Sequence, residues 1–178
     1  SRVRVTGSGL PDIGNKEFTV ETRINGKAAD LTGGIFSAYT SPGTSWDHPV
    51  KGIELWAENN VLKFGVRAYP TSTTPFVVRS LGSILRDAWY HIAGVFTGSA
   101  HNHPESLNCT VAVMAQTPHL DIYVNGQFKG CGSTGSQFIA SPASVSQMFI
   151  GGSEYGMYDG IGWNYGKLIA FNGIIDEV

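Results

Sequence analysis

Apolar and polar residues alternate with a period of two along several segments of this chain. The clearest case is 18–24, where one face would carry the apolar side chains and the other would carry Thr19, Glu21 and Arg23. Because successive side chains of a strand point to opposite faces, the pattern predicts a half-buried β-strand.

Segments 53–57 and 62–66 show the same alternation around Glu58-Asn59-Asn60, with Lys63 and Arg67 expected on the solvent face. They predict a hairpin that turns at the two asparagines. Segment 89–96 is apolar in both alternating sets, which predicts a strand in the centre of a sheet. His91 within it is expected to be a hydrogen-bonded core or sheet-face residue rather than a catalyst. Shorter strands are expected at 76–79, 109–115, 148–150 and 167–171.

No segment of ten or more residues has a helical period, and turn residues are frequent: the chain contains 23 glycines and 8 prolines, and 15% of its residues are charged. Short strands between turn signals predict an all-β fold, a two-sheet antiparallel β-sandwich. At 178 residues with 42% hydrophobic residues, the chain is expected to form a single domain over 1–178. We expect this domain to be part of a larger protein.

Three motifs carry a family resemblance. They are Trp89-Tyr90-His91-Ile92-Ala93, then Leu120-Asp121-Ile122-Tyr123-Val124-Asn125-Gly126, and the terminal Phe171-Asn172-Gly173-Ile174-Ile175-Asp176-Glu177-Val178. Together they resemble the laminin-G-like, concanavalin-A-like lectin jelly roll, and the likeness covers nearly the whole chain. The resemblance implies a non-catalytic carbohydrate-binding or adhesive module, extracellular or at the cell surface. The alternative is a structural protein–protein interaction domain in an extracellular assembly.

The expected partners are therefore a glycan or an extracellular protein, together with other domains of the parent chain. A formal charge of −2, with scattered Lys and Arg, argues against nucleic acid. No apolar run approaches the ~20 residues that a membrane-spanning helix needs, so membrane insertion is not expected.

The two cysteines, Cys109 and Cys131, flank the hairpin expected around Asn125-Gly126. A disulfide between neighbouring strands is plausible and would contribute roughly 3 kcal/mol in the chain-entropy model. Two buried free thiols are the other possibility. Asn108-Cys109-Thr110 also matches the N-glycosylation pattern, which matters if the protein is secreted by a eukaryote.

Catalysis finds little support in the sequence. Glycosidases related to this fold carry carboxylates in an E-x-D-x-x-E strand, because hydrolysis needs two acidic groups on one face. That triplet does not occur here, and Asp176 and Glu177 are adjacent, so they would point to opposite faces of a strand. We therefore expect that this domain is not an enzyme. It could serve as an accessory module attached to a polysaccharide-active enzyme.

Two metal sites are conceivable. A transition metal could be held by imidazoles and a carboxylate from His101, His103, Glu105 and His119, but a polar loop is the favoured interpretation of these residues. The family resemblance implies instead a structural Ca²⁺ at Asp176, with carbonyls from the turns around Gly14 and Gly33-Gly34. The alternative is that Asp176 accepts hydrogen bonds from backbone amides.

Aromatic residues in the long connections are the candidate ligand contacts. A sugar offers apolar C–H faces and hydroxyls, so a flat ring with carboxylate or amide partners suits it. The predicted ligand-binding residues are Trp46, Asp47, His48, Tyr155, Asp159, Trp163, Asn164 and Tyr165. The alternative is that some of these rings plug the ends of the sandwich.

Overall fold

The computed structural model describes residues 3–6, 17–40, 52–67, 76–80, 82–97, 119–133, 145–152 and 170–178. Within these ranges the chain forms eleven strands and no helix. No described segment is therefore a helix that could cross a membrane.

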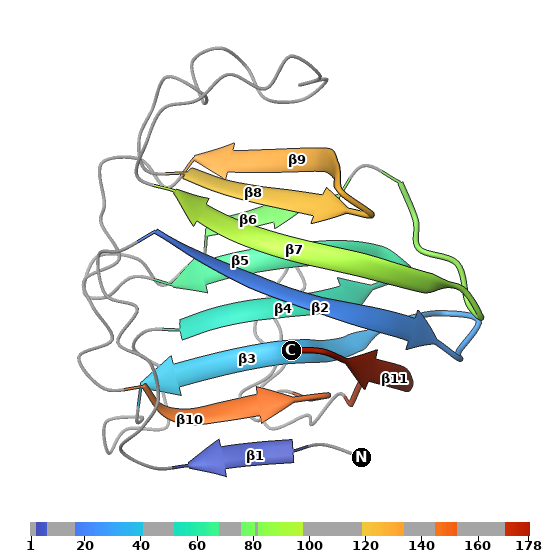
Figure 1. Ribbon diagram of the computed structural model, residues 1–178, viewed down its shortest axis with the longest axis horizontal. Coiled ribbons are helices and arrows are strands. Elements are labelled where there is room, and N and C mark those ends of the chain that lie inside the picture. The colour runs from blue at the N-terminus through green and yellow to red at the C-terminus, as the bar shows by residue number, and fades with distance from the viewer. Residues whose placement is uncertain are drawn as a thin grey trace.

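The strands form two sheets (Figure 1), and every strand pair within them is antiparallel. In spatial order, the six-stranded sheet consists of β1 (Val3–Thr6), β10 (Val145–Ile150), β3 (Gly33–Thr40), β4 (Gly52–Glu58), β5 (Val61–Arg67) and β6 (Phe76–Arg79). The five-stranded sheet consists of β11 (Gly173–Asp176), β2 (Phe18–Gly26), β7 (Trp89–Thr97), β8 (His119–Val124) and β9 (Gln127–Ser133).

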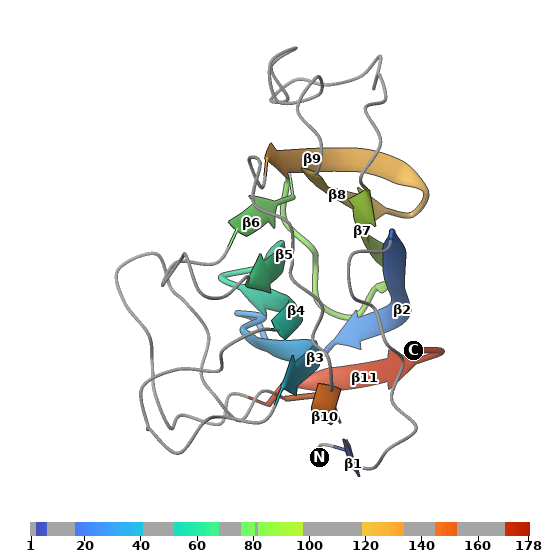
Figure 2. The ribbon, with the colours of Figure 1, turned by 90° about the vertical axis from the view of Figure 1, so that its left-hand side faces the viewer.

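The two sheets face each other across one apolar core, as the side view shows (Figure 2). Phe64 of the first sheet meets Phe18 of the second edge to face at 6.4 Å, and Phe18 stacks on Phe96 at 5.5 Å. The side chains of one sheet thus fill the space in front of the other, which is how a sandwich buries the apolar face of each layer. The predicted two-sheet antiparallel sandwich is confirmed.

Both predicted asparagine turns are present. Asn59 and Asn60 have φ values of 50° and 64°, and Asn125 and Gly126 have 52° and 75°. Positive φ at both central positions defines the turn whose twist matches that of the flanking strands, and asparagine and glycine adopt it at least cost. The β4–β5 and β8–β9 hairpins therefore follow directly from the local sequence.

The predicted central strand is also confirmed, since β7 lies between β2 and β8. Its apolar residues are not all buried, however. Trp89, at the beginning of β7, is 45% exposed on the outer face of the sheet, whereas Ile92 and Phe96 lie in the core. His91 also lies on the outer face, where its Nε2 is 3.3 Å from Glu21 Oε2, so the expected sheet-face position is confirmed.

Lys63 was expected on a solvent face, and this expectation is wrong. Its side chain is 6% exposed, forms an ion pair with Glu58, and lies 6.0 Å from the centroid of the buried Trp56 ring. The outward face of the β4–β5 hairpin is thus itself buried at this point, which a period of two within the hairpin cannot reveal.

The strand expected at 167–171 is not formed by the described part of that segment. Ala170 makes only an isolated parallel bridge to Gly34. Phe171 is buried in the core, and its N–H donates to Gly151 O (3.1 Å), while Asn172 O accepts from Lys27 N–H (2.8 Å). These residues bond to the ends of both sheets, so they connect the two layers before β11 begins at Gly173.

Candidate ligand-binding site

A pocket of ≈ 320 Å³ lies where the β8–β9 turn faces residues that follow β6. This volume is at the lower end of the about 300–1,000 Å³ that is usual for small-ligand sites. The lining residues are Ser80, Gly82, Ser83, Ile84, Tyr90, Val124, Asn125, Gln127 and Lys129.

One wall of the pocket is the β8–β9 turn, which is fixed to the start of β7. Asn125 N–H donates to His91 O (2.7 Å), and Asn125 Oδ1 accepts from His91 N–H (2.9 Å). The asparagine that sets the turn conformation therefore also holds the turn against its neighbour. Gln127 and Lys129 follow on β9, where Lys129 Nζ donates to Gln127 Oε1 (2.9 Å).

The opposite wall is formed by Ser80, Gly82, Ser83 and Ile84, and two of these residues are bonded to the β4–β5 hairpin. Ser80 N–H donates to Leu62 O (2.8 Å), and Ile84 N–H donates to Asn60 O (2.8 Å). The Ser80 hydroxyl accepts from Leu62 N–H (3.2 Å) and donates to Gly82 O (3.2 Å). Each wall thus comes from a different sheet, and both are held by main-chain hydrogen bonds.

Tyr90 joins the two walls at the base. Its hydroxyl oxygen accepts from Leu85 N–H (2.9 Å), which leaves the phenolic proton available for donation. Ile84 and Val124, which are 3% and 9% exposed, provide the apolar surface beside it.

The pocket therefore combines an aromatic and aliphatic base with a polar rim. The rim carries the side chains of Ser83, Asn125, Gln127 and Lys129, which offer both donors and acceptors. Among the described residues that line the pocket, none carries a carboxylate or an imidazole. This arrangement can hold a small polar ligand by an apolar face.

The ligand-binding residues predicted from the sequence lie outside the described residues. This holds for Trp46, Asp47, His48, Tyr155, Asp159, Trp163, Asn164 and Tyr165, and also for Asn108, Cys109, His101, His103, Glu105 and Gly14. Their roles stay predictions.

Cys131 lies on β9, where it pairs in register with Asp121 of β8. It carries no free thiol. The predicted partner, Cys109, is outside the described ranges, so the Cys109–Cys131 pairing itself stays a prediction.

Asp176, the predicted calcium ligand, is exposed at the end of β11. The hydrogen bond that the structure gives it goes to its main-chain oxygen, which accepts from Thr22 Oγ1 at 2.9 Å. Within the described part of the chain, no three histidine, cysteine, aspartate or glutamate side chains are grouped so that they could hold a metal ion. The calcium site is therefore not shown.

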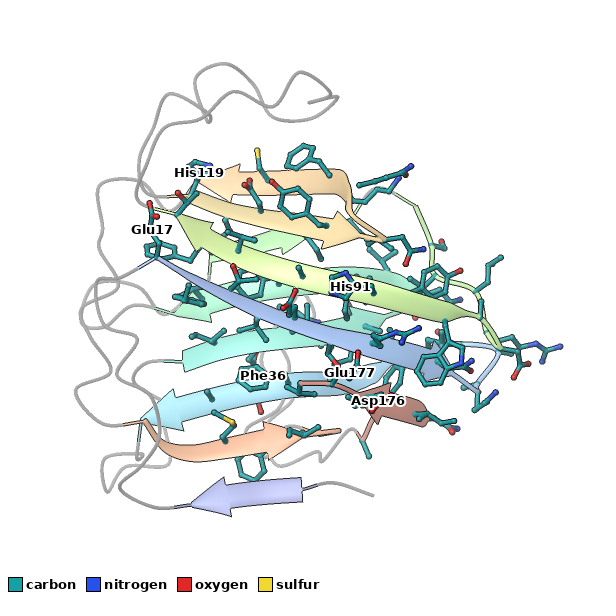
Figure 3. All side chains as sticks on the ribbon, viewed as in Figure 1. Glu17, Phe36, His91, His119, Asp176 and Glu177 are labelled. Carbon is teal, nitrogen blue, oxygen red and sulfur yellow. The ribbon has the colours of Figure 1, made fainter. Side chains whose placement is uncertain are left out.

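His119 was considered either as a transition-metal ligand together with His101, His103 and Glu105 or as part of a polar loop. It is instead the first residue of β8 and is fully buried. Its Nε2 lies 3.8 Å from Oδ1 of Asp121, which is buried as well. Figure 3 places His119 near Glu17, at the opposite end of the sheet from Asp176. Tyr123 lies further along the same strand. Its burial, with a smaller contribution from Asp121, raises the pKa of its hydroxyl to about 12.

The pocket residues were not recognised as a site from the sequence. Asn125 was noted only as a turn residue, and Tyr90 only as part of a central strand. The pocket exists because the turn meets Ser80–Ile84, which is separated from it by about forty residues of chain; no local pattern reports such a contact.

No protein-family model matches the chain, and no curated protein is similar to it at a significant level. Solved structures do match. The LG4-5 domains of the mouse laminin α1 chain align with a TM-score of 0.64 and 12% identity, over 99% of this chain and 38% of the laminin chain. A heptameric SAP-like pentraxin from Limulus polyphemus aligns with a TM-score of 0.55 and 19% identity, over 98% of this chain and 66% of the pentraxin.

A third match is the CBM40 of the Ruminococcus gnavus IT-sialidase bound to α2,3 sialyllactose, with a TM-score of 0.55 and 9% identity, over 90% of this chain and 72% of that chain. At these identities the matches define a fold. The chain has the laminin-G-like, concanavalin-A-like jelly-roll fold that its three motifs predicted. It spans well under half of the laminin chain that it matches.

Proposed function

We propose that this chain is a non-catalytic carbohydrate-binding or adhesive module of a secreted or cell-surface protein. The observation that carries the proposal is the pocket at the β8–β9 turn, with Tyr90 and two aliphatic side chains at its base and amide, hydroxyl and ammonium groups at its rim. A sugar ring has an apolar C–H face and a circumference of hydroxyls, so it matches such a base and rim in chemistry.

The size and the walls of the pocket support this assignment. A volume of ≈ 320 Å³ suits one or two sugar rings rather than a long chain. Main-chain hydrogen bonds fix both walls before a ligand arrives, which lowers the entropic cost of binding. The solved structure of a CBM40 bound to sialyllactose supports the proposal at the level of the fold.

Further contacts are proposed for the residues that the sequence indicated. Trp46, Asp47 and His48, and also Tyr155, Asp159, Trp163, Asn164 and Tyr165, would bind glycan from the connecting segments. A structural Ca²⁺ at Asp176 and a glycan on Asn108 belong to the same proposal, as does attachment to a polysaccharide-active enzyme.

Affinity electrophoresis through gels that contain single polysaccharides, together with a glycan array, tests the proposal. We expect retardation of the wild-type protein by at least one glycan. Lys129→Ala combined with Gln127→Ala should weaken the retardation, while Arg86→Ala, which removes an exposed cation outside the pocket lining, should not. Trp46→Ala and Trp163→Ala test whether the connecting segments also bind the glycan, because weaker retardation of these variants would show a contribution from outside the pocket. If no glycan retards the wild-type protein, carbohydrate binding is contradicted.

The second candidate is a structural protein–protein interaction domain in an extracellular assembly. It is favoured by large apolar side chains that are exposed on the outer face of the five-stranded sheet, namely Trp89 and Ile174, at 45% and 49%. Exposed aromatic and aliphatic groups close together are typical of protein contacts.

A further inference from the structure

The pocket at the β8–β9 turn carries a single charge among the described residues that line it, the ammonium group of Lys129. No described carboxylate forms an ion pair with this ammonium, and its hydrogen bond goes to the neutral Gln127 Oε1 (2.9 Å). An ammonium has three hydrogens, so two of them are left for a ligand. Because the charge stands beside an apolar base, it attracts an anion more strongly than it would in bulk water.

The amide side chains of the turn have already used their oxygens. Asn125 Oδ1 accepts from His91 N–H (2.9 Å), and Gln127 Oε1 accepts from Lys129 Nζ. A side-chain amide carries one oxygen and one NH₂ group, so the hydrogens of Asn125 Nδ2 and Gln127 Nε2 are what these residues mainly have left. This wall of the pocket therefore presents donors.

The base and the opposite wall have the same bias. Tyr90 Oη accepts from Leu85 N–H (2.9 Å), so its proton is left for a ligand. The Ser80 hydroxyl has used both of its functions, because it accepts from Leu62 N–H (3.2 Å) and donates to Gly82 O (3.2 Å). The hydrogen bonds within the chain thus occupy acceptors of the pocket and leave donors beside one cation.

A neutral sugar suits this set of groups less well than an acidic one. Each sugar hydroxyl brings a donor as well as acceptors, and among the described lining side chains only the Ser83 hydroxyl keeps an oxygen without a bond from the chain. A ligand donor that finds no acceptor loses its bond to water, which lowers the affinity. An ionised carboxylate or sulfate brings acceptors only.

We propose that the pocket binds an acidic sugar, a monosaccharide unit that carries one carboxylate or one sulfate group. The anion lies at Lys129, where one cation matches one negative charge and the hydrogen bonds are charge-assisted. The C–H face of the ring packs on Tyr90, Ile84 and Val124. This inference rests on the proposed carbohydrate binding and names the class of ligand.

A glycan array that carries acidic sugars beside their neutral counterparts tests the inference. The probes are glucuronate beside glucose, and galacturonate and 6-sulfated galactose beside galactose, so the array also distinguishes a carboxylate from a sulfate. We expect the wild-type protein to bind at least one acidic sugar about tenfold more tightly than its neutral counterpart, the effect of one hydrogen bond to a charged group. This binding should weaken as the ionic strength rises.

Variants of the rim test the roles of its donors. Lys129→Gln should abolish the preference for the acidic sugar, and Lys129→Arg should retain most of it, because arginine restores the charge. Asn125→Asp replaces the NH₂ group by a carboxylate oxygen at a turn position that aspartate tolerates, and should weaken binding of the acidic sugar. Arg86→Ala, which removes an exposed cation outside the lining, is the control and should leave the affinity unchanged.

Urea unfolding of each variant establishes that it is folded at the concentration used on the array. A neutral sugar that binds as tightly as its acidic counterpart, or a Lys129→Gln protein that keeps the preference, would overturn the inference and leave carbohydrate binding in place. If no sugar is bound on the array or in the gels, the proposed function fails and this inference fails with it.

Discussion

Gly94 of β7 lies directly against Phe64 of β5, across the space between the two sheets, and Gly94→Ala is a sharp test of this packing. A Cβ atom at this position would lie 2.4, 2.5 and 2.7 Å from three carbons of the Phe64 ring. Those distances are far below van der Waals contact, and Phe64 is fully buried and packed on Phe18. The ring can therefore move away only by displacing other core side chains.

The expected magnitude follows from two opposing effects. Overpacking a closely packed core costs about 1–3 kcal/mol, and the contact distances place this site at the upper end. Replacing glycine by alanine restricts the unfolded chain and returns about 0.4–1 kcal/mol. We expect a net loss of about 2 kcal/mol in the free energy of unfolding, which lowers the Tm by about 4–8 °C for a chain of this size.

Urea unfolding followed by circular dichroism and tryptophan fluorescence measures this loss. Thr19→Ala, an exposed substitution on the outer face of β2, is the control and should change stability by less than about 0.5 kcal/mol. Combining Gly94→Ala with Phe64→Leu should cost less than the sum of the two single changes, because the smaller side chain makes room for the methyl group. A Gly94→Ala protein as stable as the wild type would refute the close approach of the sheets.

Four further predictions concern single sites. Asn60→Ala should lower the free energy of unfolding by about 2 kcal/mol, because it combines a positive φ of 64° with loss of the side-chain bond to a main-chain N–H; an unchanged urea midpoint would contradict this. The hydrogen bond from Lys27 lowers the pKa of Asp87 below its usual 3.8, so its stabilisation is complete above that value and is lost as the pH falls through the lowered pKa. Asp87→Asn should therefore be less stable than the wild type at neutral pH, and the gap should close under acid; a pH-independent gap would refute it. If Asp176 binds Ca²⁺, calcium should raise the Tm of the wild type but not that of Asp176→Ala. A wild-type protein that melts at the same temperature with and without calcium would contradict the calcium site. Cys131→Ser should cost roughly 3 kcal/mol, and a reductant should lower the wild type to the same stability; a wild type whose stability the reductant leaves unchanged would contradict the bridge.

Local features of the chain could be predicted from the sequence because each depends on neighbouring residues only. The alternation in 18–24 requires one wet face and one buried face, and β2 has both. Asn59-Asn60 and Asn125-Gly126 tolerate positive φ, so the two hairpins form where these pairs occur. The motif at 89–96 likewise specified a central strand.

Contacts between distant segments could not be predicted in this way. Lys63 has the pattern of a solvent-facing residue, yet it is buried with Glu58, because the outer face of its hairpin is covered. Trp89 has the pattern of a core residue, yet it is half exposed, because the outer face of β7 is open at that end. Alternation distinguishes the two faces of a strand but does not state what lies over each.

The sequence by itself determined that this protein is a two-sheet antiparallel sandwich, where its main hairpins turn and which strand is central. Only the tertiary structure decided that β11 pairs with β2, that Gly94 meets Phe64, and that the β8–β9 turn closes a pocket against Ser80–Ile84. The physical reason is that strand propensity and turn conformation are set by adjacent residues. Pairing, burial and pockets depend instead on which surfaces the whole chain brings together.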